Sequence, residues 1–162
     1  YKAFQKRFYE LTKSMGKEQY LVPYLMSSHP GSTMKDAIAL ACFLKAEGLH
    51  PEQVQDFYPT PGTISTCIFY TGLDPYTMQP VYVPRSAKEK AAQRAMLQYF
   101  KPENHALIRS ALMKAGRRDL IGSGPHCLVP AAQNSKSPSG RQKEKPQCKH
   151  TSRQSNHKKT RR

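Results

Sequence analysis

Apolar positions at the start of the chain repeat with helical spacing. Phe4, Phe8, Leu11 and Met15 follow one another at steps of three and four residues, which places side chains on one face of an α-helix. Gly16 is a suitable residue to end that helix. The repeat is already under way at the first residues, with no initiator methionine and no N-cap before it. We therefore expect the parent protein to continue upstream.

The next segments predict strands that alternate with a helix. Residues 20–26 form an apolar run that predicts a short buried strand, and residues 54–58 predict a weaker one. Pro23 lacks an amide donor, so the first strand is expected to begin late or to lie near an edge of the sheet. Between them, Thr33 and Asp36 have the spacing of a capping box. The helix that they open is expected to end at Gly48. A strand–helix–strand order with short connections predicts a parallel sheet or barrel, and hence an α/β fold.

The second half of the chain predicts a helical extension. Residues 64–84 follow no regular pattern and are rich in aromatic side chains. Ser86 and Glu89 have capping-box spacing and open a predicted helix, and Pro102 opens another that ends at Gly116. Two successive helices with a short joint predict a helical hairpin.

Charge is distributed unevenly along the chain. The 162 residues include 26 Lys and Arg and 11 Asp and Glu, a formal net charge of +15. Residues 133–162 hold ten of those basic residues, one acidic residue and no Val, Ile, Leu, Phe, Tyr or Met. Such a segment buries too little apolar surface to offset the entropy of ordering it, so we predict a disordered basic tail. Its charge fits either nucleic acid or an acidic partner, or a solvated tail that binds nothing.

Two classes of site are not expected. No run of eighteen apolar residues occurs, so we expect no membrane partner, and we expect a cytoplasmic protein. The cysteines at positions 42, 67, 127 and 148 are separated by 25, 60 and 21 residues, unlike zinc or cluster ligands. We therefore expect reduced thiols and no metal site in this chain. Cys42, on an apolar helix face, is expected to be a small buried hydrophobe.

Two motifs follow the predicted strands. Met-Ser-Ser-His-Pro-Gly-Ser-Thr spans residues 26–33, and Phe-Tyr-Pro-Thr-Pro-Gly-Thr spans residues 57–63. Together they resemble the last two βα turns of radical-SAM barrels, which commonly read Ile-x-Gly-x-Pro-Gly-Glu-Thr and then an aromatic segment ending in Pro-Gly-Thr. The chain departs from that pattern at Ser28, where glycine is usual, and at Ser32, where glutamate is usual.

The chain is more closely similar to the YgiQ-like subfamily of radical-SAM proteins. The similar segments run in order through residues 20–24, 27–31, 54–59, 70–72, 120–123 and 127–130. The resemblance implies the C-terminal portion of such a protein. It places the last βα units of a partial (β/α) barrel in residues 1–63, a C-terminal extension with a helical hairpin in residues 64–132, and the basic tail in residues 133–162.

The resemblance implies a parent enzyme with two cofactors. A [4Fe-4S] cluster on a Cys-x-x-x-Cys-x-x-Cys loop would bind S-adenosylmethionine, and its reductive cleavage would give a 5′-deoxyadenosyl radical that abstracts hydrogen from an undefined substrate. The upstream part of the chain and an electron donor protein are the implied partners. Because the three cluster cysteines are not in this sequence, we expect this chain alone to bind neither cofactor and to be inactive.

The turn at residues 27–31 is the candidate cofactor site. Ligand sites in parallel α/β folds lie at the carboxyl ends of strands, and the following helix N-terminus directs amide donors outward. By resemblance, the residues that meet the adenosyl part of S-adenosylmethionine are Ser27, Ser28, His29, Pro30 and Gly31. The alternative is an ordinary strand–helix turn, for which Pro-Gly is common.

Two further side chains are weaker candidates, the role of His29 within the turn has two interpretations, and no catalytic residue is assigned. His29 is either a proton donor or substrate contact, or a hydrogen-bond donor to its own turn. Tyr58 and Thr60 end the second predicted strand and are candidates to face the barrel cavity, although a tyrosine there is more often a core residue.

The competing hypothesis is a basic, non-enzymatic module that binds RNA or ribosomes through its helices and tail. A coding frame that continues upstream of Tyr1 and encodes the cluster loop would decide for the enzyme.

Overall fold

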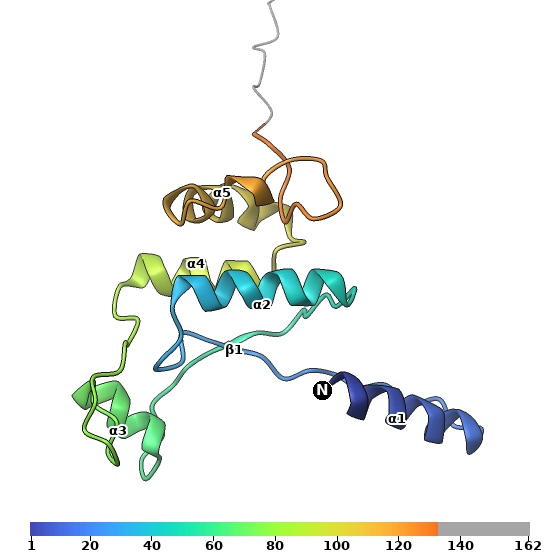
Figure 1. The fold of residues 1–162 in the computed structure, drawn as a ribbon, viewed down its shortest axis with the longest axis horizontal. Coiled ribbons are helices and arrows are strands. Elements are labelled where there is room, and N and C mark those ends of the chain that lie inside the picture. Colours follow the sequence, from blue (N-terminus) through green and yellow to red (C-terminus); the bar gives the residue numbers. More distant parts are fainter. Residues whose placement is uncertain (133–162) are drawn as a thin grey trace, which may run out of the picture. The chain divides into compact units, whose positions relative to one another are not determined.

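The structure, a computed structural model, describes residues 1–132. The predicted disordered tail at residues 133–162 lies outside this part of the chain. The described residues form one compact unit. Its elements are α1 (Lys2–Ser14), β1 (Met26–Ser27), α2 (Met34–Ala46), β2 (Gln55–Asp56), α3 (Ile64–Thr71), α4 (Ala87–Leu97), η1 (Pro102–Asn104), α5 (His105–Lys114) and η2 (Arg118–Leu120) (Figure 1).

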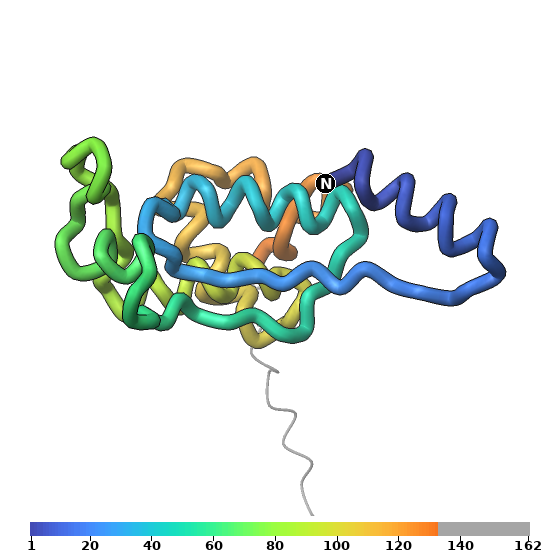
Figure 2. The backbone as a smooth tube through the Cα atoms, turned by 90° about the horizontal axis from the view of Figure 1, so that it is seen from below, coloured from blue at the N-terminus to red at the C-terminus, as the bar shows by residue number. Residues whose placement is uncertain are grey.

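The two strands pair in parallel, as predicted. Met26 is the register partner of Gln55, and Ser27 is the partner of Asp56. Figure 2 shows the chain segments around β1 and β2 running side by side. The parallel sheet is therefore confirmed. The described residues hold these two strands in their only sheet, and the barrel stays a prediction.

The strand in residues 20–26 begins late, as Pro23 predicts, but the predicted burial of this segment is wrong for its exposed side chains. Regular strand begins only at Met26, and Tyr20, Val22 and Tyr24 are 77%, 87% and 69% exposed. In a sheet, apolar side chains are buried by elements packed on both faces. Within the described part of the chain, no element covers these three side chains, so an apolar pattern here does not produce burial.

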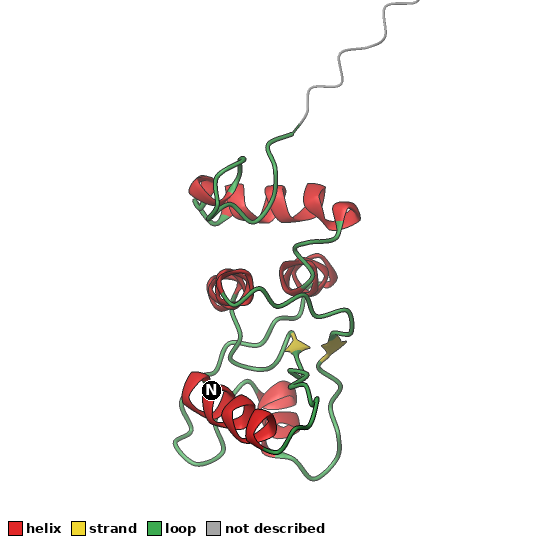
Figure 3. Ribbon diagram, turned by 90° about the vertical axis from the view of Figure 1, so that its right-hand side faces the viewer, coloured by secondary structure: helices red, strands yellow, loops and turns green. Residues whose placement is uncertain are grey.

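Three helices build the core. Figures 1 and 3 show α2 and α4 side by side in one layer, with β1 and β2 below that layer and α5 above it. The largest fully buried apolar side chains of these helices are Ile38, Leu44, Met96, Leu97, Ile108 and Leu112. Burial of each such side chain contributes about 1.5–3 kcal/mol. The packing of α4 on α5 confirms the helical hairpin.

Helix α4 also contacts both strands. It belongs to the predicted extension, whereas β1, β2 and α2 belong to the predicted end of the barrel. The two predicted segments therefore share one core, and the boundary at residues 63 and 64 stays a prediction.

Capping hydrogen bonds and left-handed glycines stabilise the ends of the helices. The Thr33 hydroxyl accepts a hydrogen bond from the Asp36 amide at 3.4 Å, and the Asp36 carboxylate accepts one from the Thr33 amide at 2.9 Å. This confirms the first capping box. Gly48 and Gly116 have φ angles of +65° and +71° just after α2 and α5, the left-handed form in which glycine commonly ends a helix.

The second capping box is a wrong prediction. Ser86 precedes α4, but its side chain makes no capping hydrogen bond. Glu89 instead accepts hydrogen bonds from the Tyr82 hydroxyl at 2.5 Å and from Gln93 Nε2 at 3.3 Å. Because these partners engage the carboxylate, it does not turn back to the helix N-terminus.

The prediction of an irregular segment over residues 64–84 is wrong at its start, where α3 forms. The hydroxyl of Thr63 accepts a hydrogen bond from the Thr66 amide at 3.2 Å, which caps the helix. Gly72, with φ of +70°, ends it. The helix contains isoleucine, threonine, phenylalanine and tyrosine, which have modest helix propensity. The cap and the terminal glycine outweigh that preference.

Helix α1 is confirmed, but its apolar stripe is exposed. Phe4, Leu11 and Met15 are 62%, 44% and 61% exposed, and Thr12 is the buried residue of this helix. Contacts near its N-terminus link it to the end of α2: the Tyr1 ring meets Phe43 edge-on at 6.1 Å. The spacing of the apolar residues thus predicted the helix, but it did not predict that most of these side chains are exposed.

Candidate functional site

The turn between β1 and α2 has an unusual backbone. Ser28 has φ of +61° and Gly31 has φ of +89°. The left-handed region costs a non-glycine residue about 1–2 kcal/mol, whereas glycine enters it readily. Position 28 is the place where glycine is usual in the radical-SAM pattern. Ser28 therefore adopts the left-handed backbone conformation that glycine would adopt more easily at this position.

Burial divides the five candidate residues into two groups. Ser27 and Ser28 are 4% and 2% exposed, and Pro30 is also buried. His29 and Gly31 are exposed. A ligand at this edge of the sheet would therefore meet His29 and Gly31, while the other three residues hold the turn in place.

A glutamine of α4 bonds the buried side of the turn. Gln93 is 1% exposed. Its Oε1 accepts a hydrogen bond from the Ser28 amide at 3.2 Å, and its Nε2 donates to the Ser32 carbonyl at 3.0 Å. The Gly31 amide donates to the Tyr82 carbonyl at 2.7 Å. The Ser28 hydroxyl is buried and has no hydrogen-bond partner among the described residues.

Both strand ends are joined to α4 by a carboxylate. The Ser27 hydroxyl donates a hydrogen bond to Asp56 Oδ1. Arg94 of α4 pairs with Asp56 Oδ2 at 2.8 Å. The sequence alone did not predict roles for Asp56, Gln93 and Arg94. The one local sign was polar Gln93 between the apolar positions of the predicted helix.

His29 bonds within its own surroundings. Its Nδ1 lies 2.8 Å from the Pro30 carbonyl oxygen, and its Nε2 lies 3.1 Å from Ser65 Oγ. A carbonyl oxygen only accepts, so Nδ1 donates the hydrogen bond to Pro30. The ring also meets Phe57 edge-on at 5.0 Å. The structure has the predicted hydrogen bond to the turn's own backbone, and a role of His29 as a proton donor or substrate contact stays a prediction.

Tyr58 and Thr60 lie beyond β2, on the way to α3. Tyr58 is 80% exposed, so it is not a core residue in this unit. The Thr60 carbonyl accepts hydrogen bonds from the hydroxyls of Thr63 at 3.0 Å and Thr66 at 2.7 Å. Thr60 therefore supports the start of α3, and its role as a cofactor contact stays a prediction.

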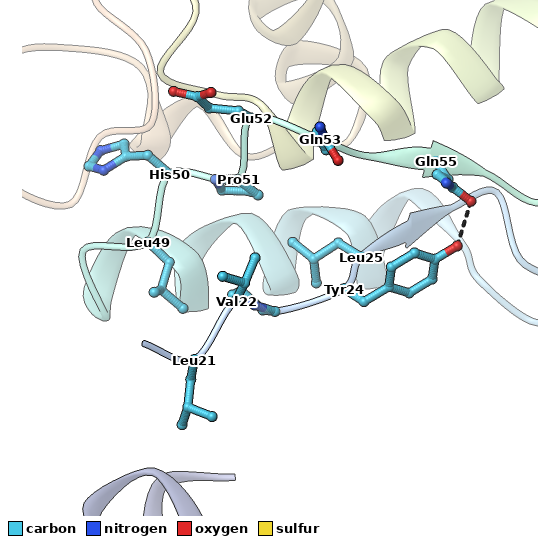
Figure 4. A pocket seen from close by; sticks show the side chains of 11 residues that line it. Leu21, Val22, Tyr24, Leu25, Leu49, His50, Pro51, Glu52, Gln53 and Gln55 are labelled. Atoms are coloured by element: carbon cyan, nitrogen blue, oxygen red, sulfur yellow. Dashed lines mark hydrogen bonds between the residues drawn. The ribbon is translucent and has the colours of Figure 1, made fainter. Parts of the chain in front are cut away.

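A pocket of about 570 Å³ lies beside the segments that lead into the strands (Figure 4). Its lining residues are Leu21, Val22, Pro23, Tyr24, Leu25, Leu49, His50, Pro51, Glu52, Gln53 and Gln55. The Tyr24 hydroxyl donates to Gln55 Oε1 at 2.5 Å at one end of this pocket. No residue of the 27–31 turn lines it, so pocket and turn are separate features.

Two further features bear on the class of site. Within residues 1–132, no three His, Cys, Asp or Glu side chains are grouped so as to hold a metal ion. None of the helices in this range has both the length and the apolar character to cross a bilayer.

The comparison with protein families gives a match over most of the chain. The profile of a family described as a domain of unknown function, DUF3362, matches residues 52–162. This chain belongs to the DUF3362 family. The DUF3362 match includes β2 and α4, and thus Asp56, Gln93 and Arg94, but it excludes the 27–31 turn.

Curated relatives match the chain closely. A UPF0313 protein of Clostridium perfringens (strain 13 / Type A) is 58% identical over 129 residues, and one of Clostridium botulinum (strain 657 / Type Ba4) is 56% identical over 130 residues. Each match covers 80% of this chain and 20% of the relative. UPF0313 is the YgiQ-like family, so the resemblance to the C-terminal portion of a YgiQ-like protein is confirmed.

The chain spans about a fifth of the length of these curated relatives. No solved structure matches it.

Proposed function

We propose that the full-length parent of this chain is a radical-SAM enzyme whose S-adenosylmethionine site includes the 27–31 turn. Membership in the YgiQ-like family supports the enzyme class. The observation that carries the site is the position of the turn at the carboxyl ends of two parallel strands. Ligands bind at this edge in parallel α/β folds, because the loops and helix N-termini converge there.

The exposed side of the strand segments supports a larger sheet in the parent. Along residues 21–25 exposed and half-buried side chains alternate, as they do in an extended strand. Leu25 packs on the core, whereas Val22 and Tyr24 are 87% and 69% exposed. In the parent, further strands of a partial (β/α) barrel would cover these apolar side chains and extend the sheet. The relatives, about five times as long as the matched segment, have the length to supply them.

The residues of the turn fit the adenosyl part of the cofactor. When bound to a reduced [4Fe-4S] cluster, S-adenosylmethionine supplies the radical that abstracts hydrogen. This chain's contribution is to bind and orient. A Cβ placed on Gly31 would meet only Val81, at 3.8 Å, so the exposed side of this glycine is open to a flat ligand group. The neighbouring His29 adds an aromatic ring at the same edge.

The test compares Gly31→Val with Gly116→Val in the cluster-loaded parent. Both glycines have left-handed φ angles, +89° and +71°, and an added Cβ meets no atom closer than 3.8 Å at either position. Both changes therefore carry a similar backbone cost, about 1–3 kcal/mol. Only position 31 lies at the proposed site, so we expect its variant to weaken S-adenosylmethionine binding by about tenfold or more.

Two measurements decide the outcome. Equilibrium dialysis gives the dissociation constant for S-adenosylmethionine, and product analysis gives 5′-deoxyadenosine formed per cluster, with cluster content and melting temperature matched between variants. Equal binding and cleavage by the two variants would make residues 27–31 an ordinary structural turn.

A further inference from the structure

We infer that Gln93 is a positioning residue of the cofactor site, and that it acts by holding the 27–31 turn in its binding form. This inference rests on the proposed function of that turn. Gln93 lies on α4, in the part of the chain that the DUF3362 profile matches, and the turn lies before that part. The DUF3362 region would then complete a site whose exposed residues come from β1 and its turn.

The orientation of the Gln93 amide follows from its partners. The Ser28 amide can only donate, so the atom 3.2 Å from it must be Oε1. The Ser32 carbonyl can only accept, so the atom 3.0 Å from it must be Nε2. One planar side chain thus joins both ends of the turn, and each of its polar ends has a partner of the correct type.

The turn requires such support because its backbone is strained. Ser28 holds φ of +61° without being glycine, and such a conformation persists only where the surroundings fix it. The Ser28 amide and the Gln93 side chain are both buried. Removal of the glutamine amide would leave a buried N–H group and the Ser32 carbonyl without this partner, which favours relaxation of the turn.

A second chain of hydrogen bonds connects Gln93 of α4 to Gly31, in the exposed part of the turn. Gln93 Nε2 also donates to Glu89 Oε1 at 3.3 Å, and Glu89 accepts from the Tyr82 hydroxyl at 2.5 Å. The Tyr82 carbonyl in turn accepts from the Gly31 amide at 2.7 Å. Gln93 therefore supports both the buried residue Ser28 and the exposed residue Gly31.

The experiment replaces Gln93 by leucine in the full-length, cluster-loaded parent, with Gln98→Leu as the matched control. Gln98 is also buried, at 8% exposed, and also donates to a backbone carbonyl, that of Glu52, at 2.6 Å. Both variants lose a buried amide next to α4, but only Gln93 touches the turn. We expect Gln93→Leu to raise the dissociation constant for S-adenosylmethionine about tenfold, and Gln98→Leu to leave it within about twofold of the parent value.

A second readout does not depend on activity. Without cofactor, hydrogen exchange of the peptide covering residues 26–34 should be faster in Gln93→Leu and unchanged in Gln98→Leu, because only the first variant loses the acceptor of the Ser28 amide. The KM for S-adenosylmethionine should rise with little change in kcat, as expected when binding geometry is impaired. If Gln93→Leu does not fold, Gln93→Met with Gln98→Met is the replacement pair, since methionine keeps the length of the side chain and removes both the acceptor of the Ser28 amide and the donor to Ser32.

The Gly31→Val variant distinguishes failure of the inference about Gln93 from failure of the proposed function of the turn. If Gly31→Val weakens S-adenosylmethionine binding but Gln93→Leu does not, the turn is a cofactor site and Gln93 does not position it. If neither variant changes binding, the proposed function of the turn fails, and the inference about Gln93 fails with it. Unchanged exchange of residues 26–34 in Gln93→Leu would also overturn the inference.

Discussion

The hydroxyl of Ser27 donates a hydrogen bond to the carboxylate of Asp56, its register partner on the neighbouring strand. Ser27 is 4% exposed. The other carboxylate oxygen pairs with Arg94 of α4 at 2.8 Å. One carboxylate therefore joins β1, β2 and α4 at the edge of the sheet where the 27–31 turn begins.

Loss of this carboxylate should cost more stability than loss of its arginine. Asp56→Ala leaves the buried Ser27 hydroxyl with only a long contact to the Gln55 carbonyl, at 3.4 Å, which costs about 1–2 kcal/mol. Arg94→Ala removes an ion pair whose side chains are 46% and 44% exposed, and such pairs contribute less than about 1 kcal/mol. Urea unfolding of the 162-residue chain measures both. A larger loss for Arg94→Ala would contradict this account.

Ser28→Gly should stabilise the chain. The change relieves the left-handed cost of about 1–2 kcal/mol and removes a buried hydroxyl without a partner. Against this, glycine adds about 0.5–1 kcal/mol of chain entropy to the unfolded state. We expect a net gain of about 1 kcal/mol in the free energy of unfolding.

Ser28→Ala serves as the control for that variant. Alanine removes the hydroxyl but keeps the Cβ, and therefore keeps the backbone cost at φ of +61°. Urea unfolding should rank glycine above alanine at this position. The reverse order would show that the positive φ angle of Ser28 stores no strain.

Local patterns predicted the features that local contacts determine. The Thr33–Asp36 capping box spans three residues, and its hydrogen bonds form within that span. The parallel order of β1 and β2 follows from the helix that connects them, because parallel strands need a long crossover connection. The exposure of Val22 could not be predicted in this way, because it depends on which other element lies across the strand.

The candidate site was predictable only in part for the same reason. The 27–31 turn has a motif that a sequence shows directly. The role of Gln93 arises from contacts with residues 65 and 61 positions away, and such contacts leave no local spacing to detect. The wrong capping box at Ser86 has a related cause, since Glu89 is engaged by Tyr82 and Gln93.

Asp36 should make stability depend on acid pH. Hydrogen bonds from the Thr33 side chain and then the Thr33 backbone hold the pKa of Asp36 below its ordinary value of 3.8. A lowered folded-state pKa means that the carboxylate stabilises the fold fully above 3.8 and loses this effect as pH falls through the lowered value. Asp36→Asn should therefore lower the melting temperature near neutral pH.

The difference between wild type and Asp36→Asn should shrink in acid. Thermal unfolding by circular dichroism, followed from neutral pH to below pH 3.8, tests this expectation. A difference in melting temperature that stays constant over this range would show that the ionised carboxylate is not what caps α2.

The cysteines should react with iodoacetamide in an order set by burial. Cys67 is exposed, whereas Cys42 is half-buried and packs against the core. Burial, as the largest effect, raises the pKa of the Cys42 thiol above its ordinary value of 9.0. Because the thiolate is the reactive form, Cys67 should be alkylated several times faster than Cys42 near neutral pH.

Peptide mass spectrometry on a Cys148→Ser chain measures the alkylation rate at the two sites. The same chain in denaturant is the control, where the two rates should converge. Faster alkylation of Cys42 in the folded chain would mean that the core does not shield its thiol as the structure shows.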